Sequence, residues 1–357
     1  MISAATPVRI LILGTGNMAV NHVTAYQKIP GIEVVAGVDR RPEVLSDFCD
    51  RFAIPHRFAT LEEAIAWGEF DAVSNVTPDA AHHATTLTFL NAGKHVLCEK
   101  PLATNERDAL EMADLARQKK LIGMVNLSYR DVAVLQKAAS LVAEGTIGTL
   151  RHFEASYLQS WLTQPAWGDW RTQDQWLWRL STRHGSKGVL GDVGIHILDF
   201  TTFAAGSRVD ALSCRLKTFD KAEGGRIGDH VLDANDSFTL QAELENGALG
   251  TISATRFASG HLNDLRLRLY GEGGGLEVRF EKRIGSLWIC RNPDLETADW
   301  YEVTAEPVPT VYDRFISAIR EDTPAEPGFD HGADLQKALD AAERSHAEGS
   351  LFLKIGE

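Results

Sequence analysis

The chain lacks the features that identify a secreted or membrane protein. It has only four cysteines in 357 residues, and their spacing matches neither a disulfide framework nor a zinc site. No apolar run reaches the ~20 residues that a membrane-spanning helix needs, and the first residues have no basic region followed by an apolar core. We therefore expect a cytoplasmic protein with no membrane partner. The cysteines are Cys49, Cys98, Cys214 and Cys290.

Positive charge is also scarce. The chain has 36 lysines and arginines against 49 aspartates and glutamates, which gives a net charge of -13. Because nucleic acids attract basic surfaces, this balance disfavours a nucleic-acid partner. The length fits two domains, on a prior of roughly 100–200 residues for each.

A glycine-rich turn follows the first apolar stretch. Residues 8–13 have the pattern of a buried strand and lead directly into Gly14-Thr15-Gly16-Asn17-Met18-Ala19. Gly14 permits a tight turn, Gly16 lets a pyrophosphate approach the backbone, and the following helix turns its N-terminus toward the phosphates. The stretch predicts a dinucleotide cofactor at Gly14, Gly16, Asn17 and Met18.

An acidic residue ends the second predicted strand. Asp39 follows the apolar residues 32–38, about 20 residues after the glycines, where a carboxylate bonds a ribose 2′-hydroxyl. This position favours NAD. Arg40 and Arg41 come next and can pair with a 2′-phosphate, so NADP stays open. Asp39 can also act simply as the N-cap of a helix that begins at Pro42.

The first half of the chain alternates strands and helices. Strands are predicted at 70–76, 95–98 and 121–126, and helices at 42–52, 61–67, 82–92 and 105–119. This rhythm predicts a doubly wound parallel sheet, whose ligands bind beyond the carboxyl ends of the strands. The strand at 95–98 ends at Glu99-Lys100-Pro101, so Lys100 is expected in that crevice. A solvated charge pair at a strand end is the alternative for these residues.

The second half is rich in predicted strands. A helix at 132–144 precedes a strand at 150–159, and alternating segments with turns fill 207–301, before helices at 311–320 and 333–348. Five tryptophans fall between residues 160 and 183. Flat rings can line a sugar pocket, or they can pack under a long loop, and both interpretations stay open. The tryptophans are Trp161, Trp167, Trp170, Trp176 and Trp178.

A polar stripe is predicted on a helix at 188–200. Asp192, His196 and Asp199 are spaced i, i+4 and i+7, which places them on one face. A histidine exchanges protons near neutral pH, so His196 is the candidate acid or base. Two or three ligands without a second cluster make a poor metal site, and we expect no metal. A metal-dependent hydrolase is the alternative, and loss of activity on chelation would reveal it.

Taken together, these motifs resemble the glucose-fructose oxidoreductase, inositol dehydrogenase and rhizopine-catabolism (Gfo/Idh/MocA) family over nearly the whole chain. The resemblance implies an N-terminal Rossmann domain (1–127) and a C-terminal α+β domain (128–357) with a large, mostly antiparallel open sheet. It also implies a homodimer or homotetramer formed through that sheet, and a C-terminal helix that packs back on the Rossmann domain. The motifs are the glycine turn, Thr77-Pro78 with His82, residues 92–103, the Asp192 to Asp199 run, and residues 329–345.

The resemblance further implies an NAD(P)-dependent oxidoreductase. Such an enzyme moves a hydride between nicotinamide and a ring hydroxyl or keto group of a sugar, sugar derivative or cyclitol. Lys100, Asp192 and His196 match the family's catalytic positions. A catalytically silent dinucleotide-binding regulator of the same fold is the alternative. Two departures are Ser186-Lys187-Gly188, where many members have three glycines, and Ser128, where an Asn is usual.

The expected ligand contacts extend beyond the catalytic positions. For the cofactor they are Gly14, Gly16, Asn17, Met18, Asp39, Arg40, Thr77, Pro78, His82, Glu99, Lys100 and Pro101. For a small carbohydrate or cyclitol substrate they are Lys100, Tyr129, Arg130, Trp170, Trp178, Arg179, Asp192 and His196.

Overall fold

The computed structural model describes residues 7–324 and 326–356 and divides them into two compact units. The first, here the Rossmann unit, contains the residues up to Ser128 together with Pro309–Gln336. The second, the sheet unit, contains Tyr129–Val308 and the residues from Lys337 onward. A late segment therefore joins the first unit, whereas the sequence placed a single boundary at 127/128. That boundary, as the limit of independently folding domains, stays a prediction.

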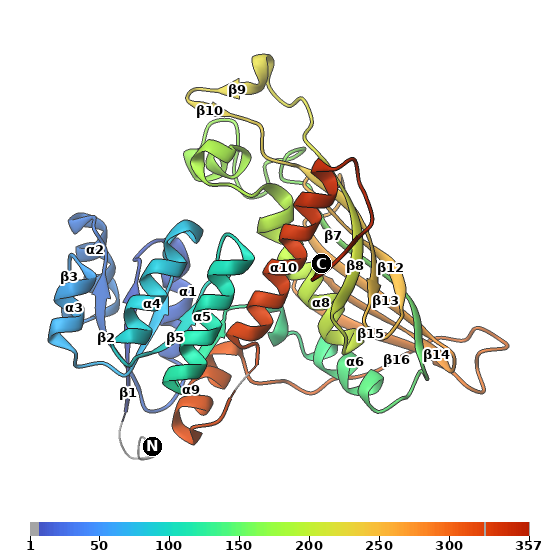
Figure 1. Ribbon diagram of the computed structural model, residues 1–357, viewed down its shortest axis with the longest axis horizontal. Helices are drawn as coiled ribbons and strands as arrows, with labels where there is room; N and C mark the ends of the chain where they lie inside the picture. Colours follow the sequence, from blue (N-terminus) through green and yellow to red (C-terminus); the bar gives the residue numbers. More distant parts are fainter. Residues whose placement is uncertain (1–6, 325, 357) are drawn as a thin grey trace. The chain divides into compact units, whose positions relative to one another are not determined.

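A six-stranded parallel sheet forms the centre of the Rossmann unit (Figure 1). Its strand order is β3-β2-β1-β4-β5-β6, the order of dinucleotide-binding folds. The predicted fold class is thereby confirmed for this half. The short strand β3 was not predicted. The strands are β1 (Val8–Leu13), β2 (Ile32–Val38), β3 (His56–Phe58), β4 (Ala72–Asn75), β5 (His95–Cys98) and β6 (Gly123–Val125).

Crossover helices connect these parallel strands. Thr60 caps α3 with a capping box, and the Asn105 side chain accepts a hydrogen bond from the Asp108 backbone at the start of α5. A helix from far along the chain, α9 (Val311–Glu321), buries Phe315 and Ile316 in the core around β1 and α1. The other helices are α1 (Asn17–Tyr26), α2 (Pro42–Phe52), α3 (Leu61–Trp67), α4 (His82–Asn91) and α5 (Glu106–Lys119).

The sheet unit is built on nine strands in the order β16-β15-β14-β13-β7-β12-β11-β8-β17. The pair β7/β12 is parallel and the other pairs are antiparallel. The predicted large, mostly antiparallel sheet is thus confirmed. The strands are β7 (Leu150–Gln159), β8 (Val209–Lys217), β11 (Ser237–Leu244), β12 (Leu249–Thr255), β13 (Asn263–Gly271), β14 (Gly274–Glu281), β15 (Ile284–Arg291), β16 (Tyr301–Glu302) and β17 (Leu353–Lys354).

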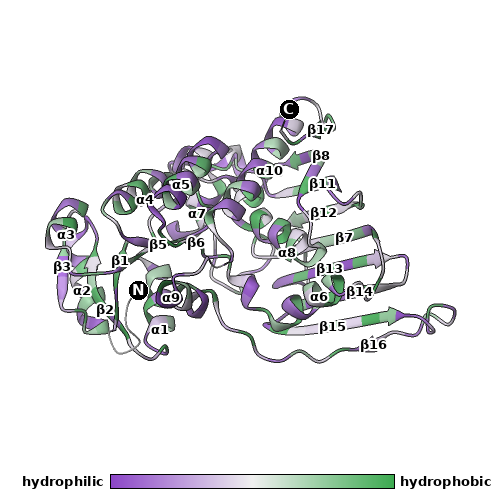
Figure 2. Cartoon of the chain, turned by 60° about the horizontal axis from the view of Figure 1, so that its bottom comes forward, coloured by the Kyte–Doolittle hydropathy of each residue, from purple (hydrophilic) through white to green (hydrophobic). Residues whose placement is uncertain are grey.

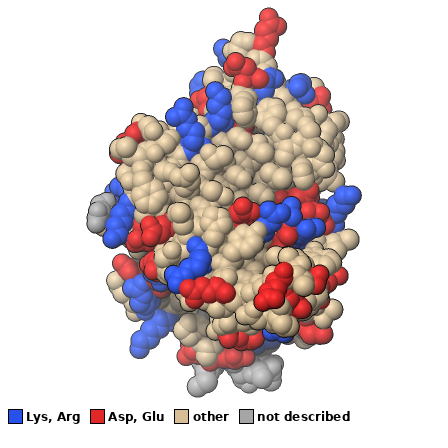
Figure 3. All heavy atoms as spheres, turned by 90° about the vertical axis from the view of Figure 1, so that its right-hand side faces the viewer, with Lys and Arg blue, Asp and Glu red and all other residues tan. Residues whose placement is uncertain are grey.

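The two faces of this sheet differ in character, because apolar and polar residues alternate along its strands (Figure 2). Helices α6 (Ala133–Ala143) and α8 (Ile195–Ala205) pack against the apolar face. The other face carries both basic and acidic side chains (Figure 3). Glu277 pairs there with Arg279 at 2.7 Å, and Arg268 pairs with Glu154 at 2.9 Å.

A long C-terminal helix and a small two-stranded ribbon complete the fold. Helix α10 (Phe329–Ala347) begins four residues before the predicted position and runs from the Rossmann unit into the sheet unit. A small ribbon of β9 (Arg226–Ile227) and β10 (His230–Val231) lies between β8 and β11 in sequence. None of the helices in residues 7–324 and 326–356 is long and apolar enough to span a lipid bilayer.

Candidate active site

The glycine turn after β1 has the geometry that a dinucleotide requires. Gly14 has φ +83°, and a Cβ there would come within 2.7 Å of the Val76 carbonyl oxygen, so only glycine fits. Gly16 is the N-cap of α1, and an added Cβ there would have no atom within 4 Å. The N-terminus of α1 is therefore open to a phosphate group. The turn therefore fits a dinucleotide, and contacts of Gly14, Gly16, Asn17 and Met18 with the cofactor stay predictions.

Asp39 lies beside this turn with both carboxylate oxygens engaged. Oδ2 accepts hydrogen bonds from the backbone N–H and the hydroxyl of Thr15, each at 3.0 Å. Arg41 donates from Nε to Oδ1 at 3.0 Å and from Nη2 to Oδ2 at 2.8 Å. Burial raises the pKa of Asp39, but the hydrogen bonds from Arg41 and Thr15 outweigh it and leave the pKa well below its usual range. Asp39 is thus ionised. The Arg41 guanidinium is bound to its carboxylate, whereas Arg40 is exposed.

Glu99 belongs to a buried polar network that sequence reasoning did not anticipate. Its Oε1 accepts from His22 Nε2 at 2.7 Å and from Asn126 Nδ2 at 2.7 Å, and its Oε2 accepts from the Lys100 backbone N–H at 3.3 Å. The second Asn126 amide hydrogen is donated to Tyr312 on α9 at 3.1 Å. Burial raises the pKa of Glu99, but His22 and Asn126 lower it to about 2. Glu99 therefore holds the backbone at Lys100 as a buried anion.

The loops after β4 and β5 carry the other predicted cofactor contacts. Thr77 and Pro78 follow β4, and the Thr77 hydroxyl donates to Asn75 Oδ1 at 2.7 Å. Lys100 and Pro101 follow β5. His82 is fully buried at the start of α4. Contacts of these residues with the cofactor stay predictions.

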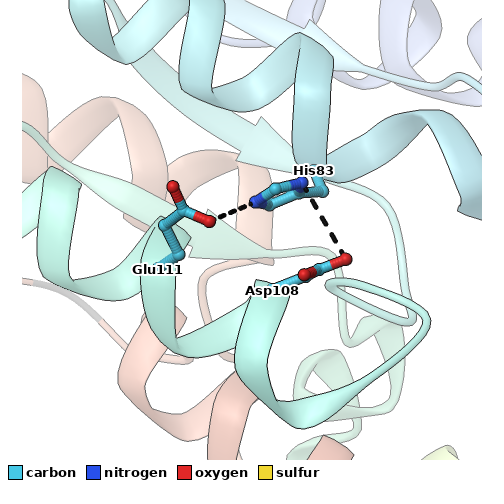
Figure 4. Close-up of side chains that lie close together, drawn as sticks. All are labelled: His83, Asp108 and Glu111. Carbon is cyan, nitrogen blue, oxygen red and sulfur yellow. Dashed lines mark hydrogen bonds and ion pairs between the residues drawn. The ribbon is translucent and has the colours of Figure 1, made fainter.

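His83, the next residue on α4, takes part in an ion-pair bridge to α5 (Figure 4). Its Nε2 lies 2.9 Å from Glu111 Oε2, and its Nδ1 lies 3.9 Å from Asp108 Oδ2. Each of the three residues offers one ligand atom, and these atoms lie within 4.8 Å of one another, close enough for a single metal ion to reach all three. In the structure the ion pairs tie α4 to α5. The expected absence of a metal stays a prediction.

Asp192 and His196 occupy one continuous helical segment of the sheet unit, but the segment is not regular. Residues Leu190–Gly194 form a π-helical turn, η5, from which α8 continues. The sequence predicted an unbroken α-helix here. A π turn has hydrogen bonds from i to i+5, so the start of this segment is wound more loosely than an α-helix. Both Asp192 and His196 lie near Tyr157, and their shared face stays a prediction. Such turns occur frequently at functional sites.

A buried arginine holds Asp192. Arg256 Nη2 donates to Asp192 Oδ2 at 2.9 Å, and Nη1 donates to the Arg179 carbonyl oxygen at 3.0 Å. The guanidinium also lies 5.0 Å from the ring centre of Trp161. Arg179 approaches the same carboxylate oxygen of Asp192 at 3.9 Å. Asp192 is therefore a carboxylate placed between two arginines. Sequence reasoning missed Arg256, although it continues the inward-facing series of Ile252 and Ala254.

His196 packs against a ring of hydrogen-bonded polar groups. Its imidazole makes an edge contact with Tyr129, with ring centres 5.0 Å apart. Asn263 Nδ2 donates to the Tyr129 hydroxyl at 2.8 Å, and the Tyr157 hydroxyl donates to Asn263 Oδ1 at 2.7 Å. The Tyr129 and Tyr157 hydroxyls are 2.5 Å apart, which closes the ring. Burial raises the pKa of Tyr157 well above its usual value, and the neighbouring Tyr129 and Asp192 raise it further. Sequence reasoning missed Tyr157 and Asn263.

Arg130 and Asp199 form a buried ion pair. Arg130 donates from Nε and Nη2 to Asp199 Oδ1 at 3.0 and 2.7 Å, and the two side chains are 4% and 1% exposed. The guanidinium also lies over the Phe203 ring at 3.7 Å. The pair ties Arg130 to Asp199 on α8. A contact between Arg130 and substrate stays a prediction.

The tryptophan-rich loop is largely a small hydrophobic core. Trp161 and Trp170 pack with Leu162, Leu177 and Leu180, and the Trp170 indole N–H donates to the Leu162 carbonyl at 3.3 Å. Trp170 is 2% exposed, whereas Trp178 is 37% exposed. Of the two tryptophans predicted to contact substrate, Trp178 is the exposed one, and the Arg179 guanidinium lies 4.5 Å from its ring centre.

Two family models match the chain. One, described as "Oxidoreductase family, NAD-binding Rossmann fold", matches residues 8–127, and the other, "GFO/IDH/MocA C-terminal domain", matches residues 135–277. Levoglucosan dehydrogenase of Pseudarthrobacter phenanthrenivorans is 26% identical over 296 residues, which cover 76% of this chain and 73% of that protein. The scyllo-inositol 2-dehydrogenase (NADP(+)) of Bacillus subtilis is 27% identical over 317 residues, which cover 88% of this chain and 89% of that protein.

The fold has a close structural counterpart. The solved structure of levoglucosan dehydrogenase in complex with NADH and levoglucosan superposes with a TM-score of 0.86 and 23% identity, over 99% of this chain and 100% of that one. At this identity the likeness concerns the fold, and it covers both units. The glycine turn, the strand order and the two family matches agree, and the chain is an NAD(P)-dependent oxidoreductase of the Gfo/Idh/MocA family.

Proposed function

We propose that the protein is a dehydrogenase that moves a hydride between NAD and a ring hydroxyl of a sugar, sugar derivative or cyclitol. The observation that carries this proposal is that the chain contains all three of the residues expected to act in catalysis. The Rossmann unit presents Lys100 after β5, and the sheet unit presents Asp192 and His196 on η5 and α8. Both curated relatives named above are dehydrogenases of such compounds, which favours an enzyme over a silent regulator.

The catalytic residues divide the work by their chemistry. Nicotinamide, when bound, accepts or supplies the hydride. Lys100 donates a hydrogen bond to the reacting oxygen and stabilises its alkoxide character. His196 takes the hydroxyl proton as substrate is oxidised and returns it in the opposite direction. Asp192, which Arg256 holds in place, orients the substrate.

Cofactor titration tests the proposal directly. NADH and NADPH are titrated separately while tryptophan fluorescence is followed, and a panel of sugars and inositols is then screened for a change in reduced-nicotinamide absorbance. Saturable binding with turnover supports the dehydrogenase. Binding without turnover over the whole panel favours the regulator, and absence of binding contradicts both.

Asp39 is expected to set the preference for NAD. Replacing Asp39 by alanine removes the acceptor for the ribose hydroxyl and releases Arg41 for a 2′-phosphate. We expect the dissociation constant of NADH to rise by about tenfold or more, the loss of one hydrogen bond to a charged group, and that of NADPH to fall. The exposed Asp47→Ala on α2 is the matched control and should change neither value. The N-cap of α2 is Arg41, so the N-cap role considered for Asp39 is wrong. Unchanged affinities in Asp39→Ala would show that Asp39 only holds Thr15 and Arg41 in place.

Arg256 is expected to support substrate binding through Asp192. Arg256→Met replaces the guanidinium group by an apolar end on a side chain of similar length. It removes both hydrogen bonds, so Asp192 loses its fixed position. We expect kcat/KM for the sugar to fall by about tenfold or more, with the NADH dissociation constant unchanged. The exposed Arg215→Met on β8 serves as control. An Arg256→Met enzyme with the kinetics of the unmodified protein would remove Arg256 from the site.

We also propose a cytoplasmic homo-oligomer. All four cysteines are free thiols, which suits a reducing compartment. The polar face of the nine-stranded sheet, with its pairs of arginine and glutamate, is the surface proposed to join copies as a homodimer or homotetramer. Sedimentation analysis tests this assembly, and Arg268→Glu, which places like charges beside Glu154 and Glu277, should shift the protein toward monomer.

A further inference from the structure

We propose that His82 is a positioning residue that stays an imidazolium cation and ties the loop after β4 to the loop after β5. This inference rests on the proposed function, because these two loops carry Thr77, Pro78, Lys100 and Pro101, which are expected to contact the cofactor. His82 acts through the loops themselves, since its side chain is fully buried.

The contacts of both ring nitrogens determine the charge. His82 Nδ1 lies 2.7 Å from the Pro101 carbonyl oxygen, and Nε2 lies 2.9 Å from the Thr77 carbonyl oxygen. A carbonyl oxygen can only accept a hydrogen bond. A neutral imidazole donates from one nitrogen and carries a lone pair on the other. It would therefore place a lone pair against one of these oxygens, whereas an imidazolium donates to both.

The surroundings of the ring favour the charged form. The groups that face it are the Cys98 thiol at the end of β5 and the Asp79 carboxylate on the short helix η1 (Asp79–Ala81). Burial lowers the pKa of His82, but Cys98, Asp79 and the Pro101 carbonyl outweigh it and raise the pKa to about 10. A buried cation without such partners would be expelled or neutralised.

The direction of the pH dependence follows from this shift. The folded protein binds the His82 proton more tightly than the unfolded chain, whose histidines titrate near pH 6.5. The contribution to stability is therefore complete below about pH 6.5, declines above it, and is lost as the pH passes about 10. Within the folded protein the ring stays charged up to pH 9, and above pH 10 one of the two loops is released.

Nitrogen NMR of the unmodified protein measures the charge without requiring any activity. With ¹⁵N-labelled histidine, we expect His82 to show two protonated ring nitrogens from pH 6 to pH 9, in contrast to histidines that titrate in this range. Triple-resonance experiments assign the signal among the twelve histidines. One protonated and one bare nitrogen at pH 7.5 would overturn the proposal.

Variants test the link to the cofactor. A glutamine donates from a single nitrogen, so His82→Gln can serve only one of the two carbonyls, and we expect the NADH dissociation constant to rise by about tenfold or more. In the unmodified protein NADH affinity should drop above pH 10 by a one-proton step that His82→Gln lacks. The neighbouring His83→Gln, which loses the ion pairs with Glu111 and Asp108, should bind NADH normally.

The possible outcomes separate this inference from the proposed function. Unmodified protein that binds neither NADH nor NADPH contradicts the proposed function, whatever the NMR shows. Folded His82→Gln that binds NADH as tightly as the unmodified protein contradicts the positioning role alone. A circular-dichroism melt of each variant identifies folding defects, and the NMR result on the unmodified protein decides the charge state if His82→Gln does not fold.

Discussion

Replacing Lys100 by alanine is expected to lower turnover by about a hundredfold or more, the usual size of an acid/base or oxyanion contribution. The change removes the ammonium group that we propose to stabilise the reacting oxygen. It leaves the loop in place, because the loop is held through the Lys100 backbone N–H, which donates to Glu99 Oε2. NADH binding should therefore survive the substitution.

The measurement is steady-state kinetics with the sugar or inositol that the screen identifies, beside an NADH titration of each variant. Lys119→Ala, an exposed lysine in the last turn of α5, is the matched control and should leave both values unchanged. Lys100→Ala with normal turnover would refute the catalytic assignment. A variant that loses turnover and NADH binding together would show that Lys100 serves the cofactor rather than the reaction.

Much of the Rossmann unit could be predicted because its signals are local. The signals are a strand that leads into Gly14, the helix that follows, and an acidic residue after the next strand. They lie within about 30 residues, the length of one βαβ unit. Helix α9 was predicted as a helix, but its place in this unit was not. It returns to β1 and α1 after the whole sheet unit has intervened, and a local pattern carries no information on such a distant partner.

The substrate side shows where sequence reasoning stops. The spacing of Asp192 and His196 indicated one helical segment, which the structure confirms, but the π turn at Leu190–Gly194 depends on packing that the spacing does not contain. Arg256 occupies an inward-facing position that alternation alone would fill with an apolar residue. The arginine at this position binds Asp192, a residue 64 positions away in the sequence.

The tryptophan loop and Glu99 show the same limit. Pattern alone could not decide between a pocket wall and a packed loop, and the structure places Trp161 and Trp170 in a core while Trp178 is exposed. Glu99 was expected to contact the cofactor. That contact stays a prediction, and the structure adds that the carboxylate binds His22, Asn126 and the Lys100 backbone, three groups that the folded sheet brings together.

The ion pair of Arg130 and Asp199 offers the largest expected change in stability. Arg130→Met leaves the Asp199 carboxylate buried without its cation, and breaking such a pair costs about 3–5 kcal/mol. Urea unfolding followed by tryptophan fluorescence measures this loss, since seven of the eight tryptophans lie in the sheet unit. The exposed pair of Arg151 and Glu272 is the control, and Arg151→Met should leave the unfolding midpoint unchanged.

A second substitution separates structure from catalysis at this pair. Adding Asp199→Leu to Arg130→Met removes the stranded charge, and apolar replacements of a whole buried pair are often neutral or stabilising, so the double variant should recover most of the lost stability. If Arg130 serves only to support α8, catalytic activity returns with stability. If Arg130 also contacts substrate, as the sequence predicted, the double variant folds stably while its KM for the sugar stays raised. Failure of the double variant to regain stability would contradict the account of Arg130 and Asp199 as a pair whose charges compensate each other.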